Sequence, residues 1–194
     1  MKIRKKCRIC NHKLQRIISF KKISLVGNFY RKKGDKKKFP ISLNYCKKCK
    51  HVQIAEIINP KKLFSNYLWQ TSVSRTNFLI FEKLLSKYKK FFSKKSKLLE
   101  IACNDGSFLK YVQKRCSCFL VGIDPAKNIF TGDKNIKFIN NFFDFSVSKQ
   151  LLRKFGKFDI IFARNVLAHV TNPNEIFKGV KELLSKKGIF IVEV

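Results

Sequence analysis

The fold is decided by the stretch Leu98-Leu99-Glu100-Ile101-Ala102-Cys103-Asn104-Asp105-Gly106. Its apolar first half predicts a buried strand, and its polar, glycine-containing second half predicts a tight turn into a helix. The next apolar run closes with Gly122-Ile123-Asp124-Pro125, which puts a carboxylate at the end of a second strand. Ligands of open parallel sheets bind at the carboxyl ends of the strands, so we expect this turn and Asp124 to line one pocket.

Short apolar runs alternate with amphipathic segments from Lys97 to the end of the sequence. Strands are predicted over residues 98–102, 119–123, 136–139, 158–162 and 188–194, with helices over 105–116, 125–130, 145–155 and 173–185. This alternation predicts parallel strands joined by right-handed crossovers. The expected fold class is α/β, with a doubly wound, Rossmann-like sheet whose pocket is surrounded by the loops after Ala102, Ile123, Ile139 and Phe162.

Two features upstream of the sheet mark domain boundaries. Four cysteines and a Gly34-Asp35 turn in a lysine-rich loop indicate a small metal-dependent module. Asn59-Pro60 then marks a break, because the residue before proline avoids helical angles. An apolar i, i+3, i+4 stripe predicts a helix from Ser74 or Thr76 to Phe92. The expected domains are a four-cysteine module over residues 1–58, a helical connector over 59–96 and an incomplete Rossmann-like domain over 97–194.

Two Cys-x-x-Cys pairs predict a zinc site. Four thiolates on two tight turns can surround Zn²⁺ tetrahedrally, and four sulfurs leave no open position for water, so the metal is expected to be structural. The alternative is a pair of buried or redox-active dithiols. His12 and His51 beside the pairs are expected at the surface, and the other three cysteines are expected as apolar fillers. The predicted ligands are Cys7, Cys10, Cys46 and Cys49.

The net charge of +31 allows two interpretations. Lysine and arginine clusters gain affinity for nucleic acid by displacing counterions from phosphates, and the densest runs lie within residues 31–38, 47–50 and 87–97. Lysine is also spread over every segment, as on an ordinary solvated surface. No run approaches a membrane span and no signal peptide precedes the seven cysteines, which predicts a cytoplasmic protein with reduced thiols and no membrane partner.

The turn in the deciding stretch is not built for a diphosphate. A dinucleotide site needs Gly-x-Gly-x-x-Gly so that the backbone can approach the pyrophosphate. This turn offers Ala102, Asn104 and Ser107 at those places, which argues against NAD.

S-adenosylmethionine suits the same turn better, because it presents a carboxylate, an ammonium and a ribose with two free hydroxyls. Glu100 and Asp105 supply acidic acceptors, and Gly106 lets the backbone come close. The start of the following helix supplies amide donors for the carboxylate. Asp124 can accept hydrogen bonds from both ribose hydroxyls, so S-adenosylmethionine is the expected cofactor.

Two later loops are expected at the same pocket. Asn141 and Phe142, after the third strand, can offer an amide and an apolar face to adenine, although core packing would use the same phenylalanines. Asn165 follows the fourth strand and is expected near the transferred methyl group. His169 either touches the substrate or packs within the fold.

Taken together, the motifs resemble a known family, the zinc-containing C-methyltransferases that act on nucleotide-linked keto-deoxysugars. The similar segments are the two Cys-x-x-Cys pairs, Tyr67-Leu68-Trp69-Gln70-Thr71-Ser72-Val73-Ser74, residues 100–106, Gly122-Ile123-Asp124-Pro125 and Ala163-Arg164-Asn165-Val166-Leu167-Ala168-His169-Val170. They occur in order over essentially the whole sequence. In that family a base removes the acidic proton beside the sugar ketone, and the resulting enolate attacks the methyl group of S-adenosylmethionine.

This resemblance implies roles for individual residues and a nucleotide-linked sugar as the substrate. Ala102 replaces the glycine usual in the family and would crowd the cofactor. The candidate catalytic residues are Tyr67, Asn165 and His169. The candidate cofactor-binding residues are Tyr67, Ser72, Glu100, Ala102, Asn104, Asp105, Gly106, Asp124, Pro125, Asn141, Phe142 and Asn165.

The resemblance also implies a longer protein. Family members continue for about as long again, with a domain that supplies the base, and their sheet has seven strands where this sequence predicts five. We therefore expect an amino-terminal piece that binds cofactor weakly and does not turn over alone, with a separate carboxyl-terminal half as a partner. The outer edge of its last strand would be unpaired and apolar.

Two other hypotheses remain open. A zinc-containing RNA methyltransferase would use the module and the lysines to hold the phosphate backbone, with an RNA affinity that falls steeply as salt rises. A non-catalytic zinc module, with the sheet as its scaffold, would give no heat signal with S-adenosylmethionine.

Overall fold

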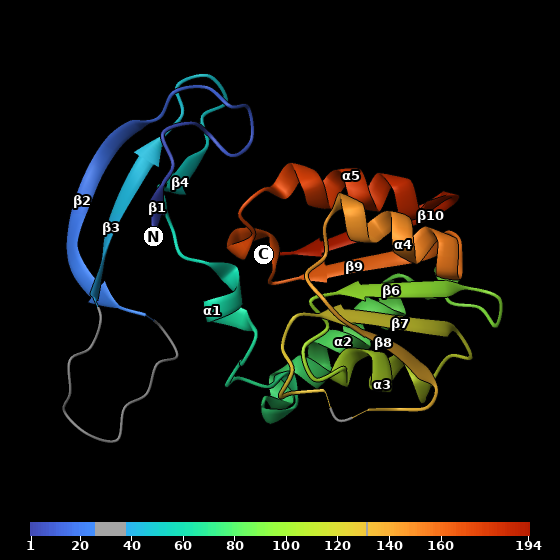
Figure 1. The fold of residues 1–194 in the computed structure, drawn as a ribbon. Helices are drawn as coiled ribbons and strands as arrows, with labels where there is room; N and C mark the ends of the chain where they lie inside the picture. Colours follow the sequence, from blue (N-terminus) through green and yellow to red (C-terminus); the bar gives the residue numbers. More distant parts are fainter. Residues whose placement is uncertain (26–37, 131) are drawn as a thin grey trace. The chain divides into compact units, whose positions relative to one another are not determined.

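The computed structural model describes residues 1–25, 38–130 and 132–194, so the predicted Gly34-Asp35 turn lies outside the described residues. The chain forms two compact units, Met1–Leu63 and Phe64–Val194 (Figure 1). The segment expected as a connector is shared between these units, and its long helix belongs to the second one.

The first unit is built from two small antiparallel sheets. β3 is the middle strand of a three-stranded sheet in the order β2-β3-β4, and β1 pairs with β5. The strands in the described part of this unit are β1 (Lys2–Ile3), β2 (Gln15–Ser24), β3 (Lys38–Tyr45), β4 (Val52–Ile54) and β5 (Glu56–Ile57), followed by the short helix α1 (Pro60–Phe64).

The inward side of the three-stranded sheet is polar. Ser42, Asn44 and Gln53 are buried, and the Glu56 carboxylate accepts hydrogen bonds from the backbone N–H and the hydroxyl of Ser42 at 2.9 and 2.8 Å. Phe20, on the other side of the sheet, is half exposed. The buried apolar residues among those described in this unit are Cys7, Cys46 and Ala55. Such a small set cannot form a stabilising core.

The second unit contains the predicted parallel sheet. Its strand order is β10-β9-β6-β7-β8, and every neighbouring pair is parallel. The chain runs outward from β6 to β8 and then crosses to β9 on the other side of β6, so the order reverses between β6 and β9. The strands are β6 (Lys97–Ile101), β7 (Phe119–Asp124), β8 (Ile136–Asn140), β9 (Phe158–Arg164) and β10 (Leu184–Glu193). The Rossmann-like fold class is confirmed, and the reversal marks where a ligand crevice belongs.

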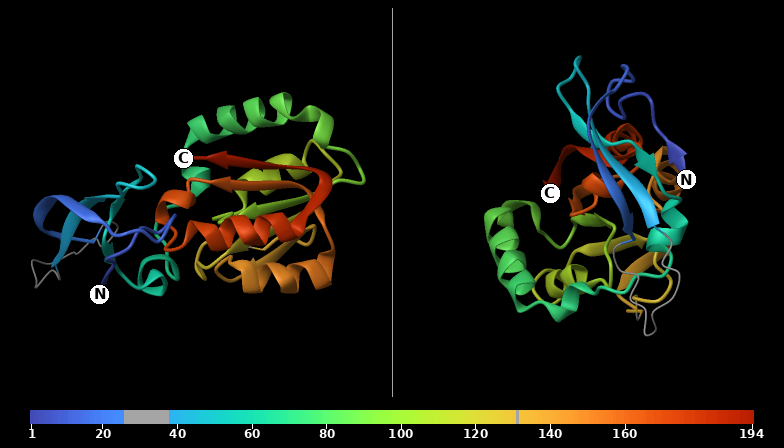
Figure 2. Two further views of the ribbon diagram at one scale, coloured as in Figure 1. Left: turned by 90° about the horizontal axis from the view of Figure 1, so that it is seen from above. Right: turned by 90° about the vertical axis from the view of Figure 1, so that its left-hand side faces the viewer.

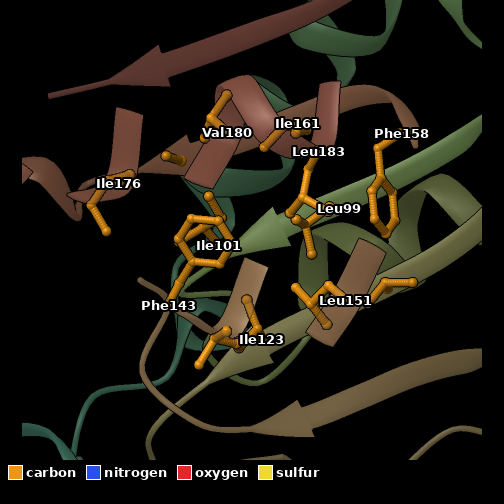
Figure 3. Close-up of a cluster of buried hydrophobic side chains, with 13 residues drawn as sticks. Leu99, Ile101, Ile123, Phe143, Leu151, Phe158, Ile161, Ile176, Val180 and Leu183 are labelled. Carbon is orange, nitrogen blue, oxygen red and sulfur yellow. The ribbon is translucent and has the colours of Figure 1, made fainter. Parts of the chain in front are cut away.

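Helices cover both faces of this sheet (Figure 2). Side chains alternate along β6, so Leu98 packs on the side of α2 and α3 while Leu99 packs on the side of α4 and α5. Figure 3 shows the α4 and α5 side, where Phe143 and Phe158 join aliphatic side chains from the strands. Burial of this kind contributes about 25 cal/mol per Å² of apolar surface. The helices are α2 (Arg75–Lys87), α3 (Ser107–Gln113), α4 (Phe145–Phe155) and α5 (Pro173–Leu183).

The helix boundaries follow local hydrogen bonding. α4 begins after Asp144, whose carboxylate accepts the Val147 N–H at 2.8 Å, and it ends at Gly156, whose φ of 74° suits glycine. Ser74 stands at the start of α2 as expected, but without a side-chain cap. α2 ends at Lys87 and not at Phe92, because the chain tightens into the 3₁₀ turn Lys89–Phe91.

The helix predicted over residues 125–130 is wrong. Asp124 accepts the Ala126 N–H at 2.8 Å, and the Lys127 N–H bonds the Ser65 carbonyl at 3.0 Å. The Asn128 side chain also accepts the N–H of Tyr67 and donates to its carbonyl, at 2.9 and 2.7 Å. The segment forms no helix, and its contacts with residues 65–67 are the long-range feature that the local pattern does not contain.

β10 forms one edge of the sheet and pairs with β9 alone among the described strands. Val192 near the end of β10 is 39% exposed, and Val194, directly after the strand, is 86% exposed. Within the described ranges, no helix combines the length and the apolar character needed to cross a membrane.

Candidate cofactor site and metal centre

The turn after β6 is wound by alternating left-handed residues. Ala102, Asn104 and Gly106 have φ angles of 56°, 54° and 73°. Alternation of this kind is the backbone pattern of concave anion-binding loops. Gly106 is needed for a second reason, because a Cβ at this position would lie 2.7 Å from the ring of Phe130. The turn therefore lies close to the Phe130 ring at Gly106, and the approach of the cofactor to this glycine stays a prediction.

Asp124 lies at the tip of β7, beside this turn. Its Oδ2 accepts the Asn104 N–H at 2.9 Å and its Oδ1 accepts the Ala126 N–H at 2.8 Å. The side chain is 6% exposed, and desolvation by burial raises its pKa above the usual value for aspartate. The carboxylate thus ties the loops after β6 and β7 together, and each oxygen keeps a further lone pair for a ligand.

The segment before α2 lies against the same turn. The Thr71 N–H donates to Asn104 Oδ1 at 2.9 Å, and Asn104 Nδ2 donates to the Trp69 carbonyl at 3.1 Å. The Ser72 N–H donates to the Asp105 carboxylate at 2.9 Å. Tyr67 is held at its backbone by Asn128. The structure therefore brings Tyr67 and Ser72 to the loops that hold Asp105 and Asp124.

Glu100 is buried near the end of β6, directly before the turn. Its side chain is 1% exposed and pairs with Arg164, whose Nη2 lies 2.8 Å from Oε1. Burial raises the pKa of Glu100 to about 7, against the opposing effect of Arg164. Sequence reasoning missed Arg164, which gives no local signal because its partner lies in another strand.

The loops after β7 and β8 carry three further candidates. Pro125 is half-buried next to Asp124, and Asn141 is exposed, with its side-chain oxygen accepting the N–H of the half-buried Phe142 at 2.8 Å. Asn140, which the sequence analysis did not single out, donates to the carbonyls of Asp124 and Ala126, both at 3.0 Å. Asn140 directly follows a predicted strand, and this position could have indicated that it lies near the ligand site.

Asn165 and His169 follow β9 and are exposed. Asn165 has a left-handed φ of 51°, and its side chain donates to Glu193 Oε1 at 3.0 Å. The His169 ring lies 6.1 Å from the Phe64 ring, which in turn lies 6.0 Å from the ring of Tyr67. Tyr67 and His169 thus both lie near one phenylalanine, although they are far apart in the sequence. Phe64 was not foreseen.

The four predicted zinc ligands come together in the first unit. Their sulfurs all lie within 4.8 Å of one another, with Cys7 and Cys49 at 3.6 Å and Cys10 and Cys46 at 3.4 Å. Sulfurs bound tetrahedrally to zinc at 2.3 Å would be about 3.8 Å apart, so the cluster fits the ion. Each pair is presented by a tight turn that closes at Asn11 or Lys50, with φ angles of 61° and 62°.

The thiols of this cluster cannot all ionise without a cation. A hydrogen bond from the Cys49 backbone helps to lower the pKa of Cys46 to about 7. The His51 backbone N–H favours the thiolate of Cys49, but desolvation and the three neighbouring sulfurs raise the pKa of Cys49 to about 12. A divalent metal supplies the missing positive charge, and bound thiols then ionise outright.

These two sites agree with comparisons to known families. A family described as "Methyltransferase domain" matches residues 75–194, and the chain belongs to it. A family described as a zinc binding domain matches residues 7–64. The cofactors expected from the sequence, S-adenosylmethionine and zinc, are thus confirmed for these two parts of the chain.

The chain also resembles individual proteins. It is 26% identical over 196 residues to the C-methyltransferase NovU of Streptomyces niveus, which covers 97% of this chain and 46% of NovU. It is 29% identical over 143 residues to the tRNA U34 carboxymethyltransferase of Sulfurimonas denitrificans, covering 69% of this chain and 44% of that protein. The chain spans about half the length of these curated relatives.

Among solved structures, the plantazolicin methyltransferase BpumL in complex with a desmethylPZN analog and SAH is similar. The TM-score is 0.50 and the identity is 24%, over 60% of this chain and 46% of that one. At this identity the match supports the methyltransferase fold and no finer assignment.

Proposed function

We propose that the second unit binds S-adenosylmethionine at the carboxyl ends of β6 and β7, and that the activity served is C-methylation of a nucleotide-linked keto-deoxysugar. Asp124 is the observation that carries the proposal. It lies at the tip of β7, and its link to the Asn104 N–H at 2.9 Å fixes it beside the turn. A carboxylate held there can accept hydrogen bonds from both hydroxyls of a ribose. The sugar acceptor is supported by the motifs of the sequence and by the likeness to a C-methyltransferase.

The exposed groups near the crevice suit a carbon acceptor. When bound, S-adenosylmethionine supplies an electrophilic methyl group. Asn165, held by Glu193, can donate a hydrogen bond to a ketone oxygen and so favour the enolate that forms when the neighbouring carbon loses its proton. Tyr67 and His169, whose rings both lie near that of Phe64, can orient the acceptor or take up that proton.

Cofactor binding is tested by isothermal titration of the 194-residue chain with S-adenosylmethionine. Asp124→Ala should weaken binding at least about tenfold, the effect of losing hydrogen bonds to a charged group. Asp133→Ala is the matched control, because Asp133 also accepts a backbone N–H, at 2.8 Å, but in the loop before β8. Parental affinity in a folded Asp124→Ala variant would overturn the proposal.

The sugar acceptor needs its own assay. Methyl transfer is followed with labelled S-adenosylmethionine and a nucleotide-linked keto-deoxysugar, for the chain alone and with the carboxyl-terminal half of a relative added. Transfer to carbon supports the proposal, and transfer only to oxygen or nitrogen acceptors contradicts the substrate class.

A second candidate, methylation of RNA, is favoured by the charge distribution. Residues 1–63 hold 20 of the 43 basic residues, against Asp35 and Glu56 as the acidic ones. One relative is a tRNA-modifying enzyme. Competition between a tRNA and single-stranded DNA of equal length separates the candidates, because attraction to phosphates alone does not distinguish them. A strong preference for the tRNA would favour the RNA candidate.

A further inference from the structure

A buried ion pair joins the carboxyl ends of β6 and β9, the two strands between which the sheet order reverses. Arg164 donates from Nε and Nη2 to the same oxygen, Oε1, of Glu100, at 3.1 and 2.8 Å. The two side chains are 10% and 1% exposed. Removing two charges from water is costly, and a pair of apolar residues would often be at least as stable. The pair therefore calls for an explanation other than stability.

The guanidinium of Arg164 is fixed from three further elements. Its Cζ lies 4.7 Å from the ring centroid of Phe81 on α2 and 4.6 Å from that of Phe108 on α3. Nη1 lies 4.0 Å from the Glu193 carboxylate at the end of β10. Stacking on aromatic faces suits the planar cation of arginine and not the ammonium of lysine. Arg164 is thus held in one orientation toward Glu100.

The second carboxylate oxygen of Glu100 does not bond to Arg164. Oε2 is buried and has no hydrogen-bond partner among the described residues. A buried acceptor without a partner is destabilising, by about 1–3 kcal/mol, unless a ligand or water satisfies it. An unpaired carboxylate oxygen in this position suits a cationic donor.

The other ionisable groups around Glu100 oppose its negative charge. Asp105 in the turn and Asp124 on β7 both raise the pKa of Glu100, and the thiol of Cys103 lies in the same region. Burial raises this pKa further, and Arg164 is the group that lowers it, to about 7. Without Arg164 the pKa of Glu100 would be higher still.

We propose that Arg164 is a positioning residue that favours the carboxylate form of Glu100 and leaves Oε2 free to accept a hydrogen bond from the ammonium group of the cofactor's methionine moiety. The inference rests on the proposed function, because S-adenosylmethionine supplies the ammonium. Arg164 does not touch the cofactor itself and acts through Glu100.

This arrangement makes binding depend on pH. An ammonium binds the carboxylate and not the neutral acid, so affinity rises as Glu100 loses its proton, between about pH 6 and 8. Removing Arg164 raises the pKa of Glu100 and shifts this rise to higher pH. A role confined to stabilising the fold would leave the pH profile in place.

The test is isothermal titration of the zinc-loaded chain with S-adenosylhomocysteine, which has the same ammonium, from about pH 6 to 8.5. Arg164→Met, which still fills the space between the rings, should lower affinity about tenfold at pH 7.5 and move the rise to higher pH. The affinity of Arg164→Lys should lie between that of the parent and that of Arg164→Met, because lysine keeps the positive charge. Arg153→Met, at an exposed position on α4, is the matched control and should behave as the parent.

A double-mutant cycle excludes a purely structural effect. If Arg164 acts through Glu100, adding Arg164→Met to Glu100→Gln causes no further loss of affinity. Equal losses in both backgrounds, or an unchanged pH profile in Arg164→Met, would overturn the inference. Thermal unfolding reports whether each variant folds. If Arg164→Met does not fold, the pH profile of the affinity of Arg164→Lys is used in its place to test the inference. A parent chain that binds at no pH refutes the proposed function, whereas normal parental binding with an unaltered Arg164→Met profile refutes only this inference.

Discussion

The Oδ2 atom of Asp105 accepts a 2.9 Å hydrogen bond from the backbone N–H of Ser72, which lies 33 positions earlier in the chain. Its Oδ1 atom accepts the N–H of Ser107 at the start of α3, at 3.0 Å. One carboxylate thereby joins the segment before α2 to the turn after β6. Each oxygen of Asp105 thus accepts one hydrogen bond within the protein, and its role as a ligand of the cofactor stays a prediction.

Replacing this carboxylate should loosen the link in a pH-dependent way. Burial opposes ionisation, but hydrogen bonds from Ser107 and Ser72 outweigh it and lower the pKa of Asp105. Its stabilising effect is therefore present above about pH 4 and is lost as the pH falls through the lowered pKa. Asp105→Asn should reduce the free energy of unfolding by about 1–2 kcal/mol at pH 7, and by less at pH 3. Urea titrations at both pH values check this, and an equal effect at the two would contradict it.

Gly106→Ala should be strongly destabilising. Its φ of 73° is strained for alanine, and the new Cβ would lie 2.7 Å from the Phe130 ring. Gly132→Ala is a matched control, because Gly132 has a φ of 77° but a Cβ added there would meet no atom within 4 Å. Both variants should lose about 1 kcal/mol to backbone strain, and Gly106→Ala should lose about 1–3 kcal/mol more through the clash. Urea midpoints that coincide would show that the ring moves aside freely.

Ala102→Gly should stabilise the second unit. Ala102 has a left-handed φ of 56°, which glycine adopts without strain. The expected gain is about 1 kcal/mol in the free energy of unfolding. Ala126→Gly, at a buried position without a positive φ, should instead lose about 0.5–1 kcal/mol. Thermal unfolding of the two variants compares them directly, and a loss of stability in Ala102→Gly would contradict the strain argument.

Cys46→Ser should abolish zinc binding and unfold the first unit. The Cys46 sulfur is fully buried among the other three ligands, and a site reduced to three thiolates loses much of its affinity. Zinc content by atomic absorption and the thiolate absorption of a cobalt-substituted sample measure this. Cys116→Ser, outside the cluster, should bind zinc as the parent does. Retention of tightly bound zinc in Cys46→Ser would rule out the four-sulfur site.

Much of the fold could be predicted because its signals are local. Each strand of the parallel sheet is a short apolar run, and Asp124 was recognisable at the end of one such run. Residues 125–130 misled the prediction because their hydrogen bonds go to residues 65–67, which no local pattern records. The end of α2 was also misplaced, since apolar residues continue into the 3₁₀ turn that follows it.

The candidate site could be predicted only in part. The turn and Asp124 lie close together because parallel strands end at the same edge, and this follows from the sequence pattern. The orientation of the Glu100 side chain does not follow from the sequence pattern, because it depends on a hydrogen bond from Arg164, 64 residues later. The ring of Phe130 beside Gly106 and the ring of Phe64 near His169 are likewise contacts between distant segments. Aromatic residues are frequent in this sequence, so composition could not single them out.

The polar interior of the three-stranded sheet has a thermodynamic consequence. Hydration of newly exposed apolar surface is the main source of the heat capacity change of unfolding, and exposed polar groups reduce it. With Ser42, Asn44, Gln53 and Glu56 turned inward, melting of the first unit should show a small heat capacity change per residue. Because zinc binds the folded unit, the melting temperature of this unit should rise with the concentration of free zinc.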